Sequence, residues 1–282
     1  MKTADARDKL IVALDVPTFD EARGLIEELG DTVLTYKVGF QLFTAYGPFM
    51  VRYLQAQGKR VFLDLKFHDI PNTVANAVAS ATGLSLPVHD ALDKEGNKTG
   101  KFSPLFIPQP APDGAGGIPS GFSEGKRLWG PLFMLTVHTQ GGVEMMKAAA
   151  EAAKKRAAEL KVPRPLIVGV TVLTSEALAN VSEVVLERAK LARSAGLDGV
   201  VCSAQEAALV RREMGRDFVI VTPGIRPKGA DTEAGDQKRV ETPAAAIQNG
   251  ASFLVVGRPI VKDRSPKQAA QNILQEIQDA NV

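Results

Sequence analysis

Charged side chains end the first three apolar segments of the chain. Asp15 ends the first segment, Lys37 the second, and Asp64 and Lys66 the third. Asp64 and Lys66 are two positions apart, so their side chains point to the same side of a strand. A carboxylate and an ammonium that lie together keep each other charged, and Lys37 on a neighbouring strand would extend the pair to an alternating row. We interpret this row as a candidate centre for polar chemistry, and the alternative is a salt-bridge network that only stabilises the fold.

A second group of residues suits a phosphate. Residues 222–227 follow the seventh apolar segment and contain Arg226, and residues 255–259 end the eighth segment with Gly257 and Arg258. Glycine lets backbone N–H groups approach an anion, and arginine supplies a bidentate positive charge. These two segments therefore predict a phosphate site.

The segment between them, residues 228–238, is polar and contains Gly229 and Gly235. This composition suits a lid that closes over a ligand. A solvated loop with no role in binding is the alternative.

Eight short apolar segments rich in Val, Ile and Leu alternate with longer amphipathic ones, as buried parallel strands alternate with helices. The predicted strands are residues 10–14, 33–38, 61–65, 132–137, 166–172, 199–202, 218–221 and 253–256. The clearest predicted helices are residues 19–29, between Thr18 and Gly30, and residues 145–160 and 184–195. Eight such units predict a (β/α)8 TIM barrel, although an open doubly wound sheet has similar elements. In a barrel, functional residues gather at the carboxyl ends of the strands, and the loops after strands seven and eight often bind phosphate.

One stretch interrupts this rhythm. Residues 84–129 hold six Pro and seven Gly in 46 residues and show little periodicity. We expect a single barrel domain over residues 1–282, with residues 84–129 as an irregular insertion between the third helix and the fourth strand. A helix-to-strand connection of a barrel lies on the face opposite the usual active site, so we expect a tolerated surface insertion, with a role in assembly or partner binding as the alternative.

The bulk composition narrows the class of protein. The chain has 282 residues, 45% of them hydrophobic, and its 34 basic and 32 acidic side chains leave a net charge of +2. This balance argues against a nucleic-acid or membrane-surface binder. A single cysteine excludes a disulfide framework and a cysteine-rich metal site. The amino-terminal residues lack the apolar region of a signal peptide, so we expect a soluble cytoplasmic protein.

Residues 62–73 form the most specific motif, with the pattern Asp-x-Lys-x-x-Asp-Ile-Pro-x-Thr from Asp64 to Thr73. Asn72 or Thr73 is expected to cap the helix that follows. The motif resembles the signature of the orotidine 5′-phosphate decarboxylases, most closely the bacterial form. The resemblance extends in order to residues 14–15, 36–39, 170–175, 199–203, 222–227, 234–237 and 257–259. It covers the chain except its termini and the insertion, which departs from the usual family pattern.

The resemblance implies an enzyme that converts orotidine 5′-phosphate to uridine 5′-phosphate in pyrimidine biosynthesis, with no cofactor and no metal. Lys66 would donate the proton to C6 of the pyrimidine, with Asp64 beside the substrate carboxylate. Lys37 would bridge Asp64 and the ribose, and Asp15 would bind the ribose hydroxyls.

The resemblance also assigns residues outside the charged row. Asp69 and Thr73 would reach into the active site of a partner subunit, which implies a homodimer with shared sites. The remaining substrate contacts would be made to the base by Thr174, or Ser175 beside it, and to the phosphate by Gln237, Gly257 and Arg258, with Arg226 supporting the loop.

Three other functions stay open from the sequence. A related barrel decarboxylase acts on sugar phosphates with Mg²⁺ and shares Asp-x-Lys-x-x-Asp, but residues 70–73 and Gln237 argue against it. A Schiff-base aldolase needs a neutral lysine, whereas nearby carboxylates favour the ammonium form of Lys66. A non-catalytic phosphate-binding barrel would be expected to lose members of the charged row, and all of them are present.

Overall fold

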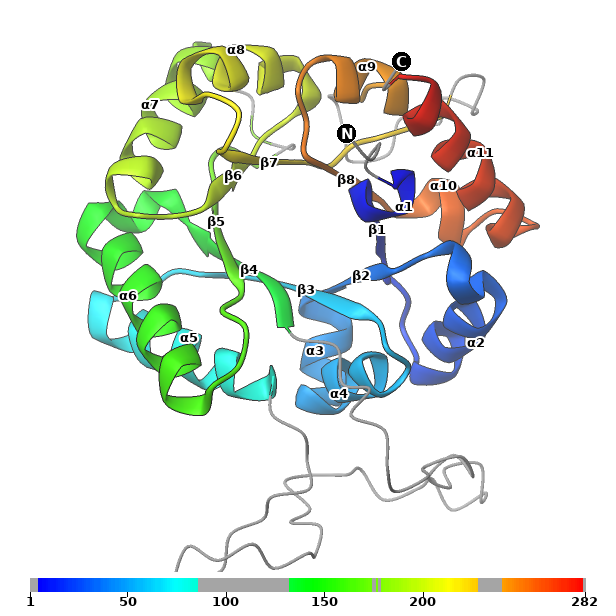
Figure 1. Ribbon diagram of the computed structural model, residues 1–282, viewed down its shortest axis with the longest axis horizontal. Helices are drawn as coiled ribbons and strands as arrows, with labels where there is room; N and C mark the ends of the chain where they lie inside the picture. Colours follow the sequence, from blue (N-terminus) through cyan, green and yellow to red (C-terminus); the bar gives the residue numbers. More distant parts are fainter. Residues whose placement is uncertain (1–4, 86–131, 174–175, 177–178, 228–239, 281–282) are drawn as a thin grey trace, which may run out of the picture.

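The computed structural model describes residues 5–85, 132–173, 176, 179–227 and 240–280, and these form a closed barrel of eight parallel strands (Figure 1). The strands are β1 (Leu10–Ala13), β2 (Thr35–Gly39), β3 (Arg60–Phe67), β4 (Leu132–His138), β5 (Leu166–Val170), β6 (Gly199–Val201), β7 (Val219–Thr222) and β8 (Phe253–Val256). They follow one another around the barrel in chain order, and β1 pairs with β8. This closure confirms the predicted (β/α)8 barrel and excludes the open sheet.

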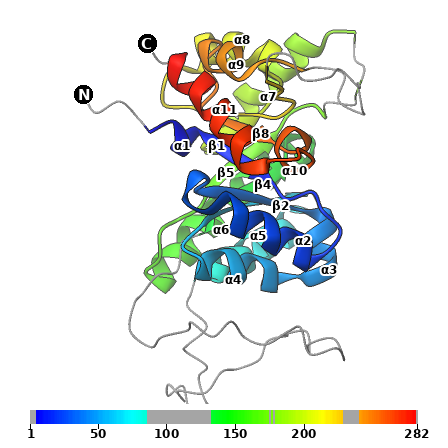
Figure 2. The ribbon, with the colours of Figure 1, turned by 90° about the vertical axis from the view of Figure 1, so that its right-hand side faces the viewer.

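Helices surround the strands, as Figure 1 shows from one end of the barrel and Figure 2 from the side. They are α1 (Ala6–Lys9), α2 (Phe19–Leu29), α3 (Phe40–Tyr46), α4 (Pro48–Ala56), α5 (Pro71–Thr82), α6 (Gly142–Leu160), α7 (Val181–Ser194), α8 (Ala204–Met214), α9 (Pro243–Gln248), α10 (Arg258–Val261) and α11 (Pro266–Asp279). Short 3-10 turns η1 (Gly30–Thr32), η2 (Gly83–Ser85) and η3 (Thr139–Gly141) join some of them to the next element. The predicted ends of α2 are confirmed, because the hydroxyl of Thr18 accepts the N–H of Glu21 and Gly30 follows the last turn.

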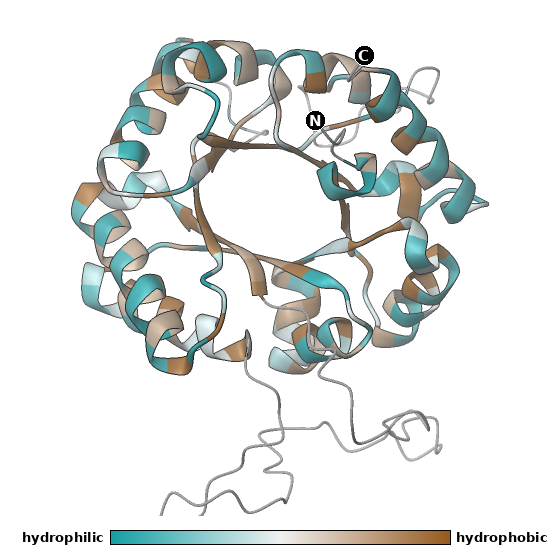
Figure 3. Cartoon of the chain, viewed as in Figure 1, coloured by the Kyte–Doolittle hydropathy of each residue, from teal (hydrophilic) through white to brown (hydrophobic). Residues whose placement is uncertain are grey.

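The strands bury apolar side chains on both faces. One cluster fills the inside of the barrel with Ile11, Ala13, Phe62, Met134, Val168, Val221 and Val255. A larger cluster lies between the strands and the helices and includes Leu63 and Leu65 of β3. Figure 3 shows largely hydrophobic strands surrounded by helices that carry both hydrophilic and hydrophobic residues. Alternation of the two faces along each strand therefore decides which residues point into the barrel.

The pairing of β3 with β4 is irregular in two places. Between the pairs Val61–Leu132 and Phe62–Met134, β4 has one extra residue, and between Leu63–Leu135 and Phe67–Val137, β3 has two. Such bulges bend a strand and re-aim its side chains, and they are common beside active sites. The second bulge carries the residues between Leu63 and Phe67.

The predicted cap of α5 is wrong. Ile70 occupies the cap position, Pro71 is the first helical residue, and Asn72 and Thr73 lie inside the first turn. Proline lacks an N–H and has a fixed φ that suits the first helical position, so Pro71 sets where the helix begins.

The predicted insertion follows α5 and begins within η2, and β4 begins at Leu132. Residues 86–131 lie outside the described residues, as does the predicted lid at residues 228–238. The connection from η2 to β4 starts and ends on the amino-terminal side of the strands. Within the described part of the chain, no helix is long and apolar enough to cross a membrane.

Candidate active site

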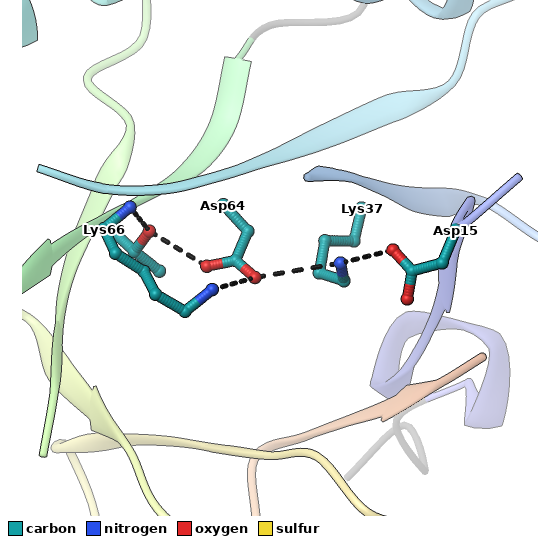
Figure 4. Close-up of polar contacts among 5 residues, drawn as sticks. Asp15, Lys37, Asp64 and Lys66 are labelled. Atoms are coloured by element: carbon teal, nitrogen blue, oxygen red, sulfur yellow. Dashed lines mark hydrogen bonds and ion pairs between the residues drawn. The ribbon is translucent and has the colours of Figure 1, made fainter. Parts of the chain in front are cut away.

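The four charged side chains predicted from the sequence lie in one row across the carboxyl-terminal mouth of the barrel (Figure 4). Lys66 Nζ lies 2.9 Å from Asp64 Oδ2, and Lys37 Nζ lies 3.7 Å from the same oxygen. Lys37 Nζ also lies 3.0 Å from Asp15 Oδ1. The side chains of Lys37 and Asp64 are only 12% and 13% exposed, whereas Asp15 is 56% exposed at the outer end. Positive and negative charges alternate along the row, so each ammonium has a carboxylate beside it.

Strand alternation brings this row together. Phe62, Asp64 and Lys66 follow one another at every second position of β3, and Phe62 belongs to the inner cluster. Asp64 and Lys66 therefore rise from the inner apolar layer into the mouth. Lys66 has a φ of +43°, a left-handed conformation that is rare for a residue with a Cβ atom. The bulge of β3 thus turns the backbone at the residue whose side chain reaches Asp64.

Gly39 gives the row its space on β2. A Cβ atom at this position would lie 3.0 Å from Lys37 Nζ and 3.6 Å from Asp15 Oδ1. A larger residue would press on the ammonium between the two carboxylates. The glycine therefore allows Lys37 to lie along the strand end.

Thr136, which was not among the predicted site residues, contacts the row from β4. Its Oγ1 accepts the backbone N–H of Lys66 at 2.7 Å and donates to Asp64 Oδ1 at 3.0 Å. The available signal was its polarity, because Thr136 is the one polar residue in the segment 132–137. A strand position inside a barrel that carries a hydroxyl among apolar neighbours needs a hydrogen-bond partner.

Phe40, the first residue after β2, was also not among the predicted site residues. Its ring centroid lies 5.4 Å from Lys66 Nζ, within the range of a cation–π contact. No pattern in the sequence pairs these two residues, because the contact depends on how β2 and β3 are placed side by side.

Of the predicted phosphate-binding residues, Gly257 lies beside the Asp15 end of the row. Gly257 follows β8, and a Cβ atom there would lie 3.6 Å from Asp15 Oδ2. Arg258 is the exposed first residue of α10. After β7, Arg226 N–H donates to the carbonyl of Glu241 at 2.9 Å, which joins the two ends of the segment that contains residues 228–239. Thr174, Ser175 and Gln237 lie outside the described residues.

Comparison with known proteins places this geometry in a family. The model of the Orotidine 5′-phosphate decarboxylase / HUMPS family matches residues 8–96 and 132–273. The chain belongs to this family.

Individual relatives carry the first of the two family names. The chain is 42% identical to an orotidine 5′-phosphate decarboxylase of Moorella thermoacetica, over 97% of this chain and 93% of the relative. It is 40% identical to one of Geobacter sp. strain M21, over 98% of this chain and 99% of the relative. A crystal structure of orotidine 5′-phosphate decarboxylase from Lactobacillus acidophilus is similar with a TM-score of 0.68 and 30% identity, covering 96% and 99% of the two chains.

Asp69 and Thr73 lie apart from the row within the described chain. Both are exposed, and Asp69 Oδ1 accepts the N–H of Ile70 at 2.6 Å. Among the described residues, no ion pair joins Asp69 to Lys66. Ile70 between them is 66% exposed, which is high for a large apolar side chain. The two residues thus lie on an exposed segment that leads into the first turn of α5, with Ile70 between them.

Two histidines stack beside the row in this family member. The rings of His68 and His138 lie 5.6 Å apart, and His138 Nδ1 accepts the N–H of Gln140. Burial lowers the pKa of His138 below its ordinary value, and the neighbouring His68 lowers it further. Across the described ranges, no three His, Cys, Asp or Glu side chains form a group that could hold a metal ion.

Proposed function

We propose that this protein converts orotidine 5′-phosphate to uridine 5′-phosphate and so serves pyrimidine nucleotide biosynthesis. The proposal rests above all on the alternating row Asp15–Lys37–Asp64–Lys66, which presents a paired ammonium at the mouth of a barrel. The relatives named above support it, because each is an orotidine 5′-phosphate decarboxylase that aligns over nearly its full length.

The reaction breaks the bond between C6 of the pyrimidine and its carboxylate. CO2 leaves, and the electron pair stays on C6 in an orbital that the ring cannot delocalise well. A preorganised ammonium can stabilise such a charge and then neutralise it. Lys66 would supply that ammonium and give its proton to C6, and solvent would restore the proton after turnover.

Asp64 has two parts in this scheme. Its Oδ2 lies 2.9 Å from Lys66 Nζ and holds the ammonium in place. The same carboxylate would lie beside the substrate carboxylate and repel it before CO2 leaves, a contribution of the kind described as ground-state destabilisation. Departure of CO2 relieves this repulsion.

The rest of the substrate would be held on either side of the row. Lys37 and Asp15 would bind the ribose, and the base would contact Thr174. Binding energy from a phosphate far from C6 can be used to favour the transition state. The phosphate would be bound by Gln237, Gly257 and Arg258, with Arg226 supporting the loop.

The alternative function is that of a Mg²⁺-dependent sugar-phosphate decarboxylase, which would need a cation site beside the row. Lys37 Nζ lies between Asp15 and Asp64, at 3.0 Å and 3.7 Å from their oxygens. An ammonium therefore occupies the space between the two carboxylates that a divalent cation would need. This arrangement favours the metal-free decarboxylation proposed here.

We propose further that the active unit is a homodimer in which Asp69 and Thr73 complete the site of the partner. Their exposure and the 66% exposure of Ile70 support this arrangement. Mixing inactive Lys66→Ala and Asp69→Ala subunits should restore activity, because one site of each hybrid dimer has both native residues. Mixtures of two Lys66→Ala preparations serve as the control. Verified subunit exchange without recovery would contradict the shared site.

The proposed activity is tested by incubating the purified protein with orotidine 5′-phosphate in excess EDTA and following the loss of its ultraviolet absorbance. We expect rapid turnover by the wild type, none by Lys66→Ala, and wild-type rates for Lys190→Ala, which removes an exposed lysine on α7. A folded wild-type protein without turnover would refute the proposal. Turnover that occurs only without EDTA would contradict the metal-free mechanism proposed here.

A further inference from the structure

Thr136 lies in the middle of β4 on the side that faces into the barrel, two residues after Met134 of the inner cluster. Its side chain is fully buried. A buried hydroxyl must find its hydrogen-bond partners within the protein. Both partners of this hydroxyl belong to β3, at the bulge that carries the reactive residues.

The chemistry of the partners fixes the direction of the hydrogen bonds. The backbone N–H of Lys66 can only donate, so Thr136 Oγ1 accepts it at 2.7 Å. An ionised carboxylate can only accept, so the hydroxyl proton points to Asp64 Oδ1 at 3.0 Å. The hydroxyl therefore connects the backbone of Lys66 to the side chain of Asp64 and has no freedom to rotate to another partner.

This connection determines which oxygen of Asp64 faces the ammonium groups. Oδ1 is engaged by Thr136, which leaves Oδ2 for Lys66 Nζ at 2.9 Å and Lys37 Nζ at 3.7 Å. The same hydroxyl binds the one N–H in the bulge whose residue has a left-handed φ. Thr136 thus holds both the carboxylate orientation and the backbone from which the ammonium projects.

We propose that Thr136 is a positioning residue for the decarboxylation, acting through Asp64 and Lys66 without touching the substrate. This inference rests on the proposed function, because it concerns how the reactive pair is held. A hydroxyl that only stabilised the fold would affect unfolding and leave the turnover of the folded protein unchanged. A positioning hydroxyl affects turnover at constant ligand affinity, because the phosphate and ribose contacts lie elsewhere.

The test compares Thr136→Val, which keeps the shape and removes the hydroxyl, with Thr136→Ser, which keeps the hydroxyl. Misplacement of a reactive group by about 1 Å can lower the rate about 100-fold, so we expect a loss of this order in kcat for Thr136→Val. KM for orotidine 5′-phosphate and Kd for uridine 5′-phosphate should stay near wild type, and Thr136→Ser should recover most of kcat.

A double-mutant cycle separates an action through Asp64 from a general effect. In an Asp64→Asn background, which is already impaired, Thr136→Val should cost much less than it does in the wild type. Thr136→Ala provides a second hydroxyl-free variant if Thr136→Val does not fold. Wild-type kcat in a folded hydroxyl-free variant, equal losses in both backgrounds, or no folded hydroxyl-free variant at all would overturn the proposal. An inactive wild type would instead refute the proposed function itself.

Discussion

The left-handed backbone at Lys66 predicts an unusual effect of glycine on stability. Lys66→Ala and Lys66→Gly both remove the ammonium and its 2.9 Å contact with Asp64, so the two variants differ only in the Cβ atom. With a φ of +43°, the alanine variant keeps an unfavourable conformation that glycine adopts freely. We therefore expect Lys66→Gly to be the more stable of the two.

The magnitude follows from two opposing terms. A left-handed conformation costs a residue with a Cβ atom about 1–2 kcal/mol. Glycine loses more backbone entropy on folding, which costs about 0.5–1 kcal/mol relative to alanine. The difference leaves Lys66→Gly more stable than Lys66→Ala by roughly 0–1.5 kcal/mol, with the midpoints of the two terms giving about 0.75 kcal/mol.

Two other lysines provide matched controls. Lys161 has a φ of +54° at the end of α6, far from the row, so glycine should again be more stable than alanine there. Lys37 lies in the extended strand β2, where glycine should be less stable than alanine by about 0.5–1 kcal/mol. The sign of the difference between glycine and alanine should therefore reverse between Lys66 and Lys37.

Urea unfolding at one fixed protein concentration measures the differences, provided that the slopes agree within each pair. The reasoning is refuted if Lys66→Gly is less stable than Lys66→Ala while the Lys161 pair shows the expected order. Turnover of orotidine 5′-phosphate should be absent in both Lys66 variants. The expected results would show that the protein gives up some stability to keep Lys66 in a strained conformation, as is common at active sites.

Three further outcomes follow from individual contacts. Gly39→Ala should lower kcat/KM about tenfold without changing the melting temperature, because its Cβ atom would lie 3.0 Å from Lys37 Nζ; an unchanged kcat/KM would contradict this. Gly199→Ala should lower the free energy of unfolding by about 1–3 kcal/mol, since its Cβ atom would lie 2.0 Å from the carbonyl oxygen of Val219. A wild-type midpoint of urea unfolding would show that β6 and β7 can separate there. Burial lowers the pKa of His138, so the unfolded chain binds its proton first and the folded state loses stability as pH falls through about 6.5. Melting temperatures between pH 8 and 5 should fall less in His138→Asn than in the wild type, and parallel curves would exclude His138 as the cause.

The spacing of apolar and charged residues along the chain was sufficient to predict the strands and the row of charged side chains. Buried parallel strands are apolar on both faces, so each of the eight was visible as a short apolar segment. The two-residue period placed Asp64 beside Lys66, and chain order placed Lys37 on the neighbouring strand. The roles assigned to Thr174 and Gln237 stay predictions, because these residues lie outside the described part of the chain.

What the sequence did not predict depends on neighbours that are distant along the chain. Thr136 meets Lys66 and Asp64 across 70 and 72 positions, through a bulge that exists only when β3 pairs with β4. The wrong cap of α5 has a different origin. Asn72 and Thr73 have a preference for cap positions, but the conformational restriction of Pro71 decides the helix start.

The two irregularities of the β3–β4 pair differ in how easily a gene could acquire them. One extra residue in β4 reverses the alternation beyond it, and Phe133 and Met134 accordingly both pack in the inner cluster. Two extra residues in β3 preserve the alternation, so Leu63 and Phe67 both pack on the outer side with their partners Leu135 and Val137. A duplication or loss of two codons at this point would leave every later side chain of the strand on its own face. Reactive groups in the bulge could therefore be gained, lost or exchanged during evolution while the rest of the barrel kept its sequence.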